Sequence, residues 1–510
     1  MMIPSTIPSS RRHFMRTLAA GAPALLGQTV RRPNVLFILA DEWRAQATGY
    51  NGDSNVRTPV LDRLASQSIS FDTAVSGTPV CCPFRASLLT GQYPLTHGVF
   101  INDVELKPDG VTMGEAFTRA GYRTGYIGKW HLYGSPGGNY ERRLAYIPPE
   151  KRFGFDYWKA CECTHEYNNS LYYEGNDQTP KYWPGYDAFA QTEDACAFIE
   201  RHATSSNERQ AKSSDPFCLV LSLGPPHFPL NSAPGKFQAA YREREIEFRP
   251  NVPQDRRAEA AGMLRGYYAH MAALDECFAL LLSSLDRTGI AEDTIVVFTS
   301  DHGDMMLSQG LTTKLYPWDE SLRVPFLVRY PRKLGTKGAR ISSPLNSPDI
   351  FPTLLGLAGL PIPGSVEGVD HSPAMTGRSR QKSENRGTLI SLAVPITEAR
   401  RYGFAEYRGL RTPRHTYVRS IRGPWLLYDN LSDPYQMHNL AGKPEAKQLQ
   451  TRLDRDLDAE LKKRKDEFLP ASEYIRRAGL GHYREVNVKV GRHASPWGDW
   501  EPTLQPWAHP

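Results

Sequence analysis

Two pairs of adjacent metal-ligating residues lie far apart in the sequence. Asp41 and Glu42 follow the apolar run NVLFILA, and Asp301 and His302 follow the apolar run in DTIVVFTS. Carboxylate oxygens with one imidazole suit a hard divalent cation such as Ca²⁺, Mg²⁺ or Mn²⁺. Acids after a strand are more often solvated turn residues or helix caps, so a cation site requires the two pairs to meet in the fold.

The stretch VCCPFRASLLTG, residues 80–91, places two adjacent cysteines where a helix is expected to begin. Pro83 is favoured in a first helical turn, and Gly91 is a typical helix end. The free amides and the dipole at a helix N-terminus favour an anion. Cys81 and Arg85 are four residues apart, so they share a helix face and the guanidinium is expected to lean toward Cys81. The stretch predicts a reactive group beside a bound anion.

Apolar segments alternate with helical patterns through most of the chain. A continuous apolar run, typical of a strand buried on both faces, occupies residues 34–40. The same pattern of a strand followed by polar residues recurs within residues 123–131, 216–229 and 293–304. Helical patterns occur at residues 59–67, 112–120, 187–202 and 256–287, and the apolar stripe of the last indicates core packing. This order predicts an α/β fold with a large, doubly wound, mixed or parallel sheet flanked by helices.

Several polar residues come just after these expected strands. In a doubly wound sheet, the loops at the carboxyl ends of the strands build the ligand site. We therefore expect one site formed by Asp41, Lys129, His131, His227, Asp301 and His302.

The hydrophobic pattern of the sequence changes near residue 387. Shorter alternating runs, such as TYVRSIR and PWLLYDN, precede a charged helical pattern at residues 444–467. This predicts a smaller C-terminal antiparallel sheet with a packing helix. We expect three divisions: a signal segment at residues 1–30, the large α/β domain at 31–386, and a C-terminal subdomain and tail at 387–510.

The first residues resemble a twin-arginine export signal. Arg11 and Arg12 precede Phe14 and an apolar run at residues 18–27, which is too short to span a bilayer. A basic amphipathic N-terminus of a cytosolic protein is the alternative. Export would place the protein in the bacterial periplasm or outside the cell, with no membrane attachment afterwards.

Charge and cysteine content exclude several classes of function. The net charge of +6 is spread over 510 residues without a dense Lys/Arg block, which argues against nucleic acid and fits a small anionic substrate. Seven scattered cysteines do not form a disulfide scaffold or a zinc spacing. Cys161 and Cys163 form either a redox pair or two buried thiols, and we favour buried thiols.

CCPFRASLLTG resembles the signature of the formylglycine-dependent (type I) sulfatases, a branch of the alkaline phosphatase superfamily. That signature is Cys, any residue, Pro, Ser, Arg and a run ending in Thr-Gly, and its cysteine is oxidised to formylglycine by a formylglycine-generating enzyme. The resemblance assigns Cys81 as the modified residue and Arg85 as the motif arginine. Phe84 stands where the family usually has Ser, which bears on how well the modifying enzyme accepts the chain.

Further stretches resemble the family from about residue 32 to residue 442. They include ILADEWR, GKWH, PPHFP, FTSDHGD, the lysine of LTTKLYPWDE, SPDIFPTLLGLAGLP and LLYDNLSDPYQMHNLA. Glu42 stands where many members have Asp, and His302 where many have Asn. The Asp-His pairing occurs in branches related to phosphonate monoester hydrolases and choline sulfatases.

The resemblance implies a divalent metal, Ca²⁺ first and Mn²⁺ or Mg²⁺ as alternatives, and roles for particular residues. One hydroxyl of the hydrated formylglycine would attack sulfur, and the other would expel sulfate. His131 is the implied base for the second hydroxyl, and His227 with Lys314 would protonate the leaving alcohol. The implied metal ligands are Asp41, Glu42, Cys81, Asp301 and His302, and the implied catalytic residues are Cys81, Arg85, Lys129, His131, His227 and Lys314.

The implied function is hydrolysis of sulfate monoesters, most of all on a sulfated carbohydrate. The polar and aromatic stretch CTHEYNNSLYYEG supplies His165 and Asn168 as candidate substrate contacts, or else it is a packed loop. Two alternatives stay open: a phosphonate monoester or phosphodiester hydrolase with the same site, and a non-catalytic binding protein with unmodified Cys81.

Overall fold

The first apolar run forms β1 (Asn34–Asp41), a central strand of the computed structural model, which describes residues 32–208, 215–377 and 387–487. Every residue of β1 is buried. Phe37 and Leu39 join the core on one face of the sheet, whereas Ile38 and Ala40 join the core on the other. Burial on both faces explains why the run has no polar alternation.

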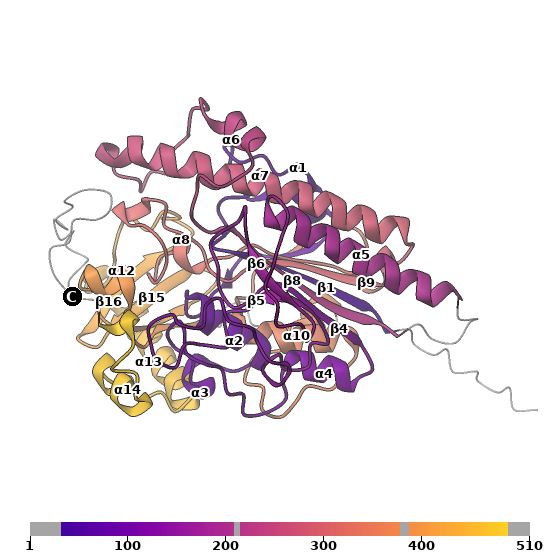
Figure 1. Ribbon diagram of the computed structural model, residues 1–510. Helices are drawn as coiled ribbons and strands as arrows, with labels where there is room; N and C mark the ends of the chain where they lie inside the picture. The colour runs from indigo at the N-terminus through magenta and orange to yellow at the C-terminus, as the bar shows by residue number, and fades with distance from the viewer. Residues whose placement is uncertain (1–31, 209–214, 378–386, 488–510) are drawn as a thin grey trace, which may run out of the picture. The chain divides into compact units, whose positions relative to one another are not determined.

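β1 belongs to a mixed sheet of ten strands in the order β11-β2-β10-β9-β1-β8-β4-β5-β6-β7, which confirms the expected fold (Figure 1). β8 (Phe217–Pro226) and β9 (Thr294–Ser300) flank β1 in parallel, and β4 (Arg123–Lys129) lies parallel to β8. The carboxyl ends of these four strands therefore meet at one edge. The other strands are β2 (Ile69–Phe71), β5 (Tyr157–Cys161), β6 (Leu171–Glu174), β7 (Lys181–Tyr182), β10 (Phe326–Arg329) and β11 (Ala339–Ile341), while β3 (Ala74–Val75) pairs with β12 (Leu345–Asn346).

Helices cover both faces of this sheet (Figure 1). α1 (Pro59–Ser66), α5 (Asp187–Glu208), α6 (Gly235–Tyr241) and α7 (Arg257–Arg287) pack on one face, and α2 (Cys81–Thr90), α4 (Met113–Arg119) and α10 (Ile350–Ala358) on the other. The apolar stripe of α7 is core, as predicted. Shorter helices are α3 (Pro94–His97), α8 (Asp319–Leu322), α9 (Pro331–Leu334), α11 (Ser372–Met375), α12 (Thr397–Arg401) and α14 (Ala471–Ala478).

Local signals set the helix ends. Thr112 and Glu115 form a capping box at the start of α4, and Gly91 ends α2 in a left-handed conformation with φ of 68°. The helix expected at residues 444–467 is shorter: a 3-10 turn (Pro444–Ala446) leads into α13 (Lys447–Lys463). Lys465 has a φ of 54°, so the chain has left the helix before residue 467.

The C-terminal part forms an antiparallel sheet of β13 (Thr388–Leu392), β14 (Tyr407–Arg411), β15 (His415–Ser420) and β16 (Gly423–Asp429). Leu453, Leu457 and Leu461 of α13 cover one face of it. Val418 on the other face packs in a cluster with Trp318, next to the large sheet. The expected domain boundary at residues 386 and 387 borders residues 378–386, which the structure does not describe, and it stays a prediction.

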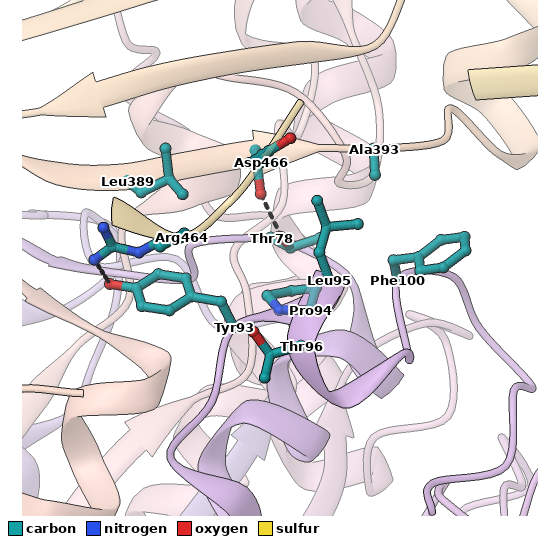
Figure 2. Close-up of a pocket in the computed structure, with 11 residues that line it drawn as sticks. Thr78, Tyr93, Pro94, Leu95, Thr96, Phe100, Leu389, Ala393, Arg464 and Asp466 are labelled. Carbon is teal, nitrogen blue, oxygen red and sulfur yellow. Dashed lines mark hydrogen bonds between the residues drawn. The ribbon is translucent and has the colours of Figure 1, made fainter. Parts of the chain in front are cut away.

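Tyr93, just before α3, contacts Arg464, just after α13 (Figure 2). This contact connects the large α/β part to the helix that covers the C-terminal sheet. The guanidinium lies 4.0 Å from the ring centroid and donates to the phenolic oxygen at 2.8 Å.

All seven cysteines are free, and all except Cys196 are buried, in line with buried thiols at Cys161 and Cys163. Within the described ranges, no helix is long and apolar enough to cross a membrane. The expected twin-arginine segment lies outside the described residues.

Candidate active site

The parallel strands bring the predicted polar residues to one buried place. Asp41 and Lys129 are the last residues of β1 and β4, and His227 follows β8 directly. Asp301 and His302 follow β9. All five side chains are buried, and the Lys129 ammonium lies 2.6 Å from Asp41 Oδ2.

Cys81 is the first residue of α2, as the sequence predicts, and it enters this site from a separate element. Its sulfur lies 3.2 Å from His302 Nε2 and 3.9 Å from Lys129 Nζ. Burial and Asp41 would raise the pKa of Cys81, but the positive charges of Lys129, Lys314 and His302 outweigh them and lower it well below its ordinary value. The helix start thus holds an ionisable nucleophile among cations.

Arg85 is fully buried in the second turn of α2 and bonds to the acids. Its NH2 lies 3.2 Å from Asp41 Oδ2 and 3.1 Å from Asp301 Oδ2, and NH1 donates to the carbonyl of Lys129 and to Ser222. The helical spacing of Cys81 and Arg85 predicts a guanidinium that leans toward Cys81. The described residues show it instead bridging the two carboxylates that line the cluster around Cys81.

Four residues fit a metal ion. One ligand atom each from Asp41, Cys81, Asp301 and His302 lies within 4.8 Å of the others, and all four residues are buried. Asp41 Oδ1 accepts no hydrogen bond from any described residue, so a buried oxygen is left for a further partner. Oxygen donors with one imidazole suit a hard or intermediate divalent cation.

Glu42 points to another group. Its Oε1 lies 3.1 Å from Lys314 Nζ, and its Oε2 lies 3.2 Å from His227 Nε2. Lys314 Nζ also donates to His227 Nε2 at 2.7 Å. Glu42 has a φ of 68°, a left-handed conformation that turns its side chain away from that of the preceding aspartate. Its predicted role as a metal ligand stays a prediction.

The charges of this second group are unequal. Burial, followed by repulsion from Lys314, lowers the pKa of His227 well below its ordinary value. Burial would also lower the pKa of Lys314, but Glu42 holds it above its ordinary value. At neutral pH the proton between these two groups therefore lies on Lys314, and the neutral imidazole accepts the hydrogen bond.

His131 comes two residues after the end of β4 and lies near Asp103, a partner that the sequence did not predict. Its Nε2 is 3.8 Å from Asp103 Oδ2, and Arg143 NH2 is 2.6 Å from the same oxygen. Burial would lower the pKa of His131, whereas Cys163, Cys82 and Asp103 together raise it well above its ordinary value. Only the polar pair after the apolar run VFI marked Asp103 in the sequence.

The two candidate substrate contacts behave differently. The ring of His165 stacks on that of His227, with centroids 4.3 Å apart and an interplanar angle of 20°. Asn168 is exposed, and its amide donates to the carbonyl of Ser232 at 2.9 Å. The structure therefore brings His165 to the site, whereas the Asn168 amide holds a neighbouring loop.

Comparison with known proteins points to one family. The family profile described as Sulfatase matches residues 33–360, and one described as N-sulphoglucosamine sulphohydrolase, C-terminal, matches residues 308–464. An ulvan-active sulfatase of Formosa agariphila is 45% identical, over 88% of this chain and 84% of that protein. An endo-4-O-sulfatase of Bacteroides thetaiotaomicron is 30% identical, over 86% of this chain and 94% of that protein. A solved structure connected with glycosaminoglycan metabolism in the same bacterium superposes with a TM-score of 0.76 at 27% identity, over 89% of this chain and 100% of that one.

Proposed function

Because the chain belongs to the sulfatase family and is a sulfuric ester hydrolase, we propose that Cys81 is converted to formylglycine and attacks the sulfur of a saccharide sulfate ester. The observation that carries this proposal is the setting of Cys81: a helix start, the Lys129 ammonium and a carboxylate-imidazole cluster around one sulfur. As its hydrate, formylglycine supplies two hydroxyl groups on one carbon, one to attack and one to release sulfate.

The metal would be held by Asp41, Asp301, His302 and the modified residue 81, with Ca²⁺ as the first candidate and Mn²⁺ or Mg²⁺ as alternatives. The buried Asp41 Oδ1, which has no partner among the described residues, supports this assignment. A bound divalent cation would acidify the attacking hydroxyl and polarise the sulfuryl oxygens. Arg85 fixes both carboxylates in place through their Oδ2 atoms.

Lys129 binds the sulfate in this proposal. Its ammonium lies 3.9 Å from Cys81 Sγ, the atom that conversion to formylglycine replaces, and it is held there by Asp41. A fixed cation at this position stabilises the negative charge of the transition state without reorganising water.

His227 and Lys314 act on the leaving alcohol. Lys314 carries the proton and His227 Nε2 receives it at 2.7 Å, so the pair can deliver a proton to the departing oxygen. Glu42 orients Lys314 through Oε1, and its Oε2 lies 3.2 Å from His227 Nε2. His165 stacks on His227 and restrains the imidazole plane.

His131 is the proposed base for the proton that leaves the second hydroxyl, and because Cys163, Cys82 and Asp103 raise its pKa, it has to lose its own proton before it accepts this one. Asp103, itself fixed by Arg143, would stabilise the imidazolium that results. In this proposal the base His131 and the relay residue His227 follow two different strands, β4 and β8.

The relatives named for ulvan and for endo-acting 4-O-desulfation support a sulfated polysaccharide or an oligosaccharide derived from it as the substrate. We also propose maturation by a formylglycine-generating enzyme and twin-arginine export to the periplasm or beyond. His165 is retained as a substrate contact, and Asn168 as a residue that shapes the adjoining loop.

Mass spectrometry of the tryptic peptide of residues 64–85, from a host with a formylglycine-generating enzyme, tests the proposal. We expect Cys81 as an aldehyde and Cys82 as an alkylatable thiol. Sulfate release from sulfated oligosaccharides should then exceed hydrolysis of a phosphonate monoester. Two intact thiols would favour the binding-protein alternative, and faster phosphonate cleavage would favour the other hydrolase.

A further inference from the structure

A cavity of about 870 Å³ lies beside the leaving-group pair. The loop after β8, helix α6, the first turns of α7 and the segment before Lys314 surround it. Phe228 in its wall follows His227, and Thr313 precedes Lys314. Ligand cavities commonly measure roughly 300–1,000 Å³. The cavity is therefore large enough for a ligand and is placed where the alcohol departs.

One side of the cavity is aromatic and apolar. The side chain of Phe228 is 45% exposed although it adjoins a buried site, and its ring centroid lies 4.1 Å from that of His227. Met263 and Met306 line the same space. An exposed aromatic face among apolar side chains suits the apolar face of a sugar ring.

Two arginines line the cavity with free guanidinium nitrogens. Arg242, directly after α6, has no hydrogen-bond or ion-pair partner among the described residues. Arg265 of α7 uses its Nε on the carbonyl of Arg244, at 3.1 Å, which leaves its two terminal nitrogens without a described partner.

Each acid of the cavity has a partner on one of its oxygens, whereas Glu259 Oε1 has none among the described residues. Glu259 pairs with Arg256 at 2.7 Å, and Asp304 accepts from the amide of Met306 at 2.7 Å. Neither Arg242 nor Arg265 forms an ion pair with an acid among the described residues, so the two arginines offer positive charge to a ligand. A guanidinium binds carboxylate and sulfate groups with paired donors.

We propose that this cavity binds an anionic sugar joined to the sulfated one, with Phe228 against its ring and Arg242 and Arg265 on its carboxylate or sulfate. The inference rests on the proposed function, since it names the neighbouring part of the same saccharide. Binding of this anionic sugar would make the enzyme selective for acidic saccharide chains over neutral ones.

Two substrates separate the cavity from the reaction centre: 4-nitrophenyl sulfate, which is too small to span both, and a sulfated disaccharide whose neighbouring sugar is a uronate. In the Arg242→Gln/Arg265→Gln variant we expect kcat/KM for the disaccharide to fall about 10- to 100-fold, because charged hydrogen bonds are lost. The aryl ester should be cleaved as by the parent enzyme. Arg119→Gln, an exposed arginine on α4, is the matched control and should change neither rate.

A second variant fills the cavity without removing a charge. A Cβ added at Gly262 of α7 meets no atom within 4 Å, and Gly262 lines the cavity. Gly262→Leu should therefore leave helix α7 intact. The variant should cleave the aryl sulfate as the parent enzyme does, while its kcat/KM for the disaccharide falls.

Reduction of the uronate carboxyl identifies the anion. If the carboxylate is the anchor, the parent enzyme should cleave the reduced disaccharide as poorly as the arginine variant cleaves the intact one. A persisting arginine effect on a reduced disaccharide with a second sulfate would assign the sulfate. The inference is overturned if the variants cleave every disaccharide normally, or if the parent enzyme cleaves only the aryl ester. Failure of the mature parent enzyme on both esters would instead overturn the proposed function.

Discussion

Replacing His227 by glutamine tests the leaving-group end of the site. Glutamine keeps an acceptor for Lys314 Nζ, which now lies 2.7 Å from His227 Nε2, and Lys314 keeps its ion pair with Glu42 at 3.1 Å. We therefore expect the variant to fold with Lys314 in place. What it loses is an imidazole that can accept and pass on a proton.

The size of the loss depends on the leaving group. A sugar alkoxide is a far stronger base than 4-nitrophenolate, so its departure needs a proton. A positioned proton donor contributes roughly 10²- to 10⁴-fold, which corresponds to about 3–5 kcal/mol of activation free energy. We expect kcat of His227→Gln to fall by that factor on a saccharide sulfate and by less than about tenfold on 4-nitrophenyl sulfate.

The assay is sulfate release under saturating substrate, with exposed His438→Gln as the control. Burial and then Lys314 hold the pKa of His227 well below its ordinary value, so it stays neutral as pH falls. The parent rate on the saccharide should therefore show no loss due to His227 between pH 7 and about 6. Equal losses on both esters would refute proton transfer and leave His227 as a positioning residue.

Other side chains of the site give three expectations. Cys81→Ala should lower kcat by about 10⁴-fold or more because the nucleophile is lost, whereas Cys82→Ala should retain most activity; the reverse result would move the modification to Cys82. Arg85→Gln leaves Asp41 and Asp301 facing each other and should cost about 3–5 kcal/mol in urea unfolding, and a loss as small as that of a surface arginine would contradict its bridging role. Adding calcium at a hundredfold its Kd to the mature, chelator-treated protein should raise its free energy of unfolding by about 2.7 kcal/mol, an effect that Asp301→Asn should abolish. An increase of the same size in that variant would place the metal elsewhere.

The sequence was sufficient to predict the large sheet and the meeting of its strand ends. β1, β8 and β9 are buried on both faces and appear as apolar runs, whereas β4 was marked by the polar residues that follow it. Parallel order brings the carboxyl ends of all four strands together. The helix start at Cys81 was equally visible because Pro83 and Gly91 mark its bounds.

The direction of individual side chains could not be predicted in the same way. Glu42 adjoins Asp41 in sequence, but its left-handed backbone directs it to His227 and Lys314. Arg85 reaches the carboxylates because two strands from distant parts of the chain end beside α2. Neither outcome has a local signal, since both depend on tertiary packing.

Asp103 was missed for a related reason. It lies on a loop with no periodic pattern, and its only function-related feature is the tertiary contact with His131 and Arg143. A helix in the C-terminal part was predicted too long because charged residues continue beyond Lys463, although the backbone turns at Lys465.

Unusual backbone conformations gather around the reacting groups. Glu42, His131 and Asp103 have positive φ angles of 68°, 60° and 62°, and Thr313 and Leu315, at 62° and 87°, flank Lys314. Each such residue costs on the order of 1–3 kcal/mol and persists only where its surroundings fix it. The buried strands and the α2 helix supply that support, because they hold the neighbouring residues from both sides. The fold therefore gives up stability to hold the proposed base His131 and the proposed relay residue His227 after the ends of β4 and β8.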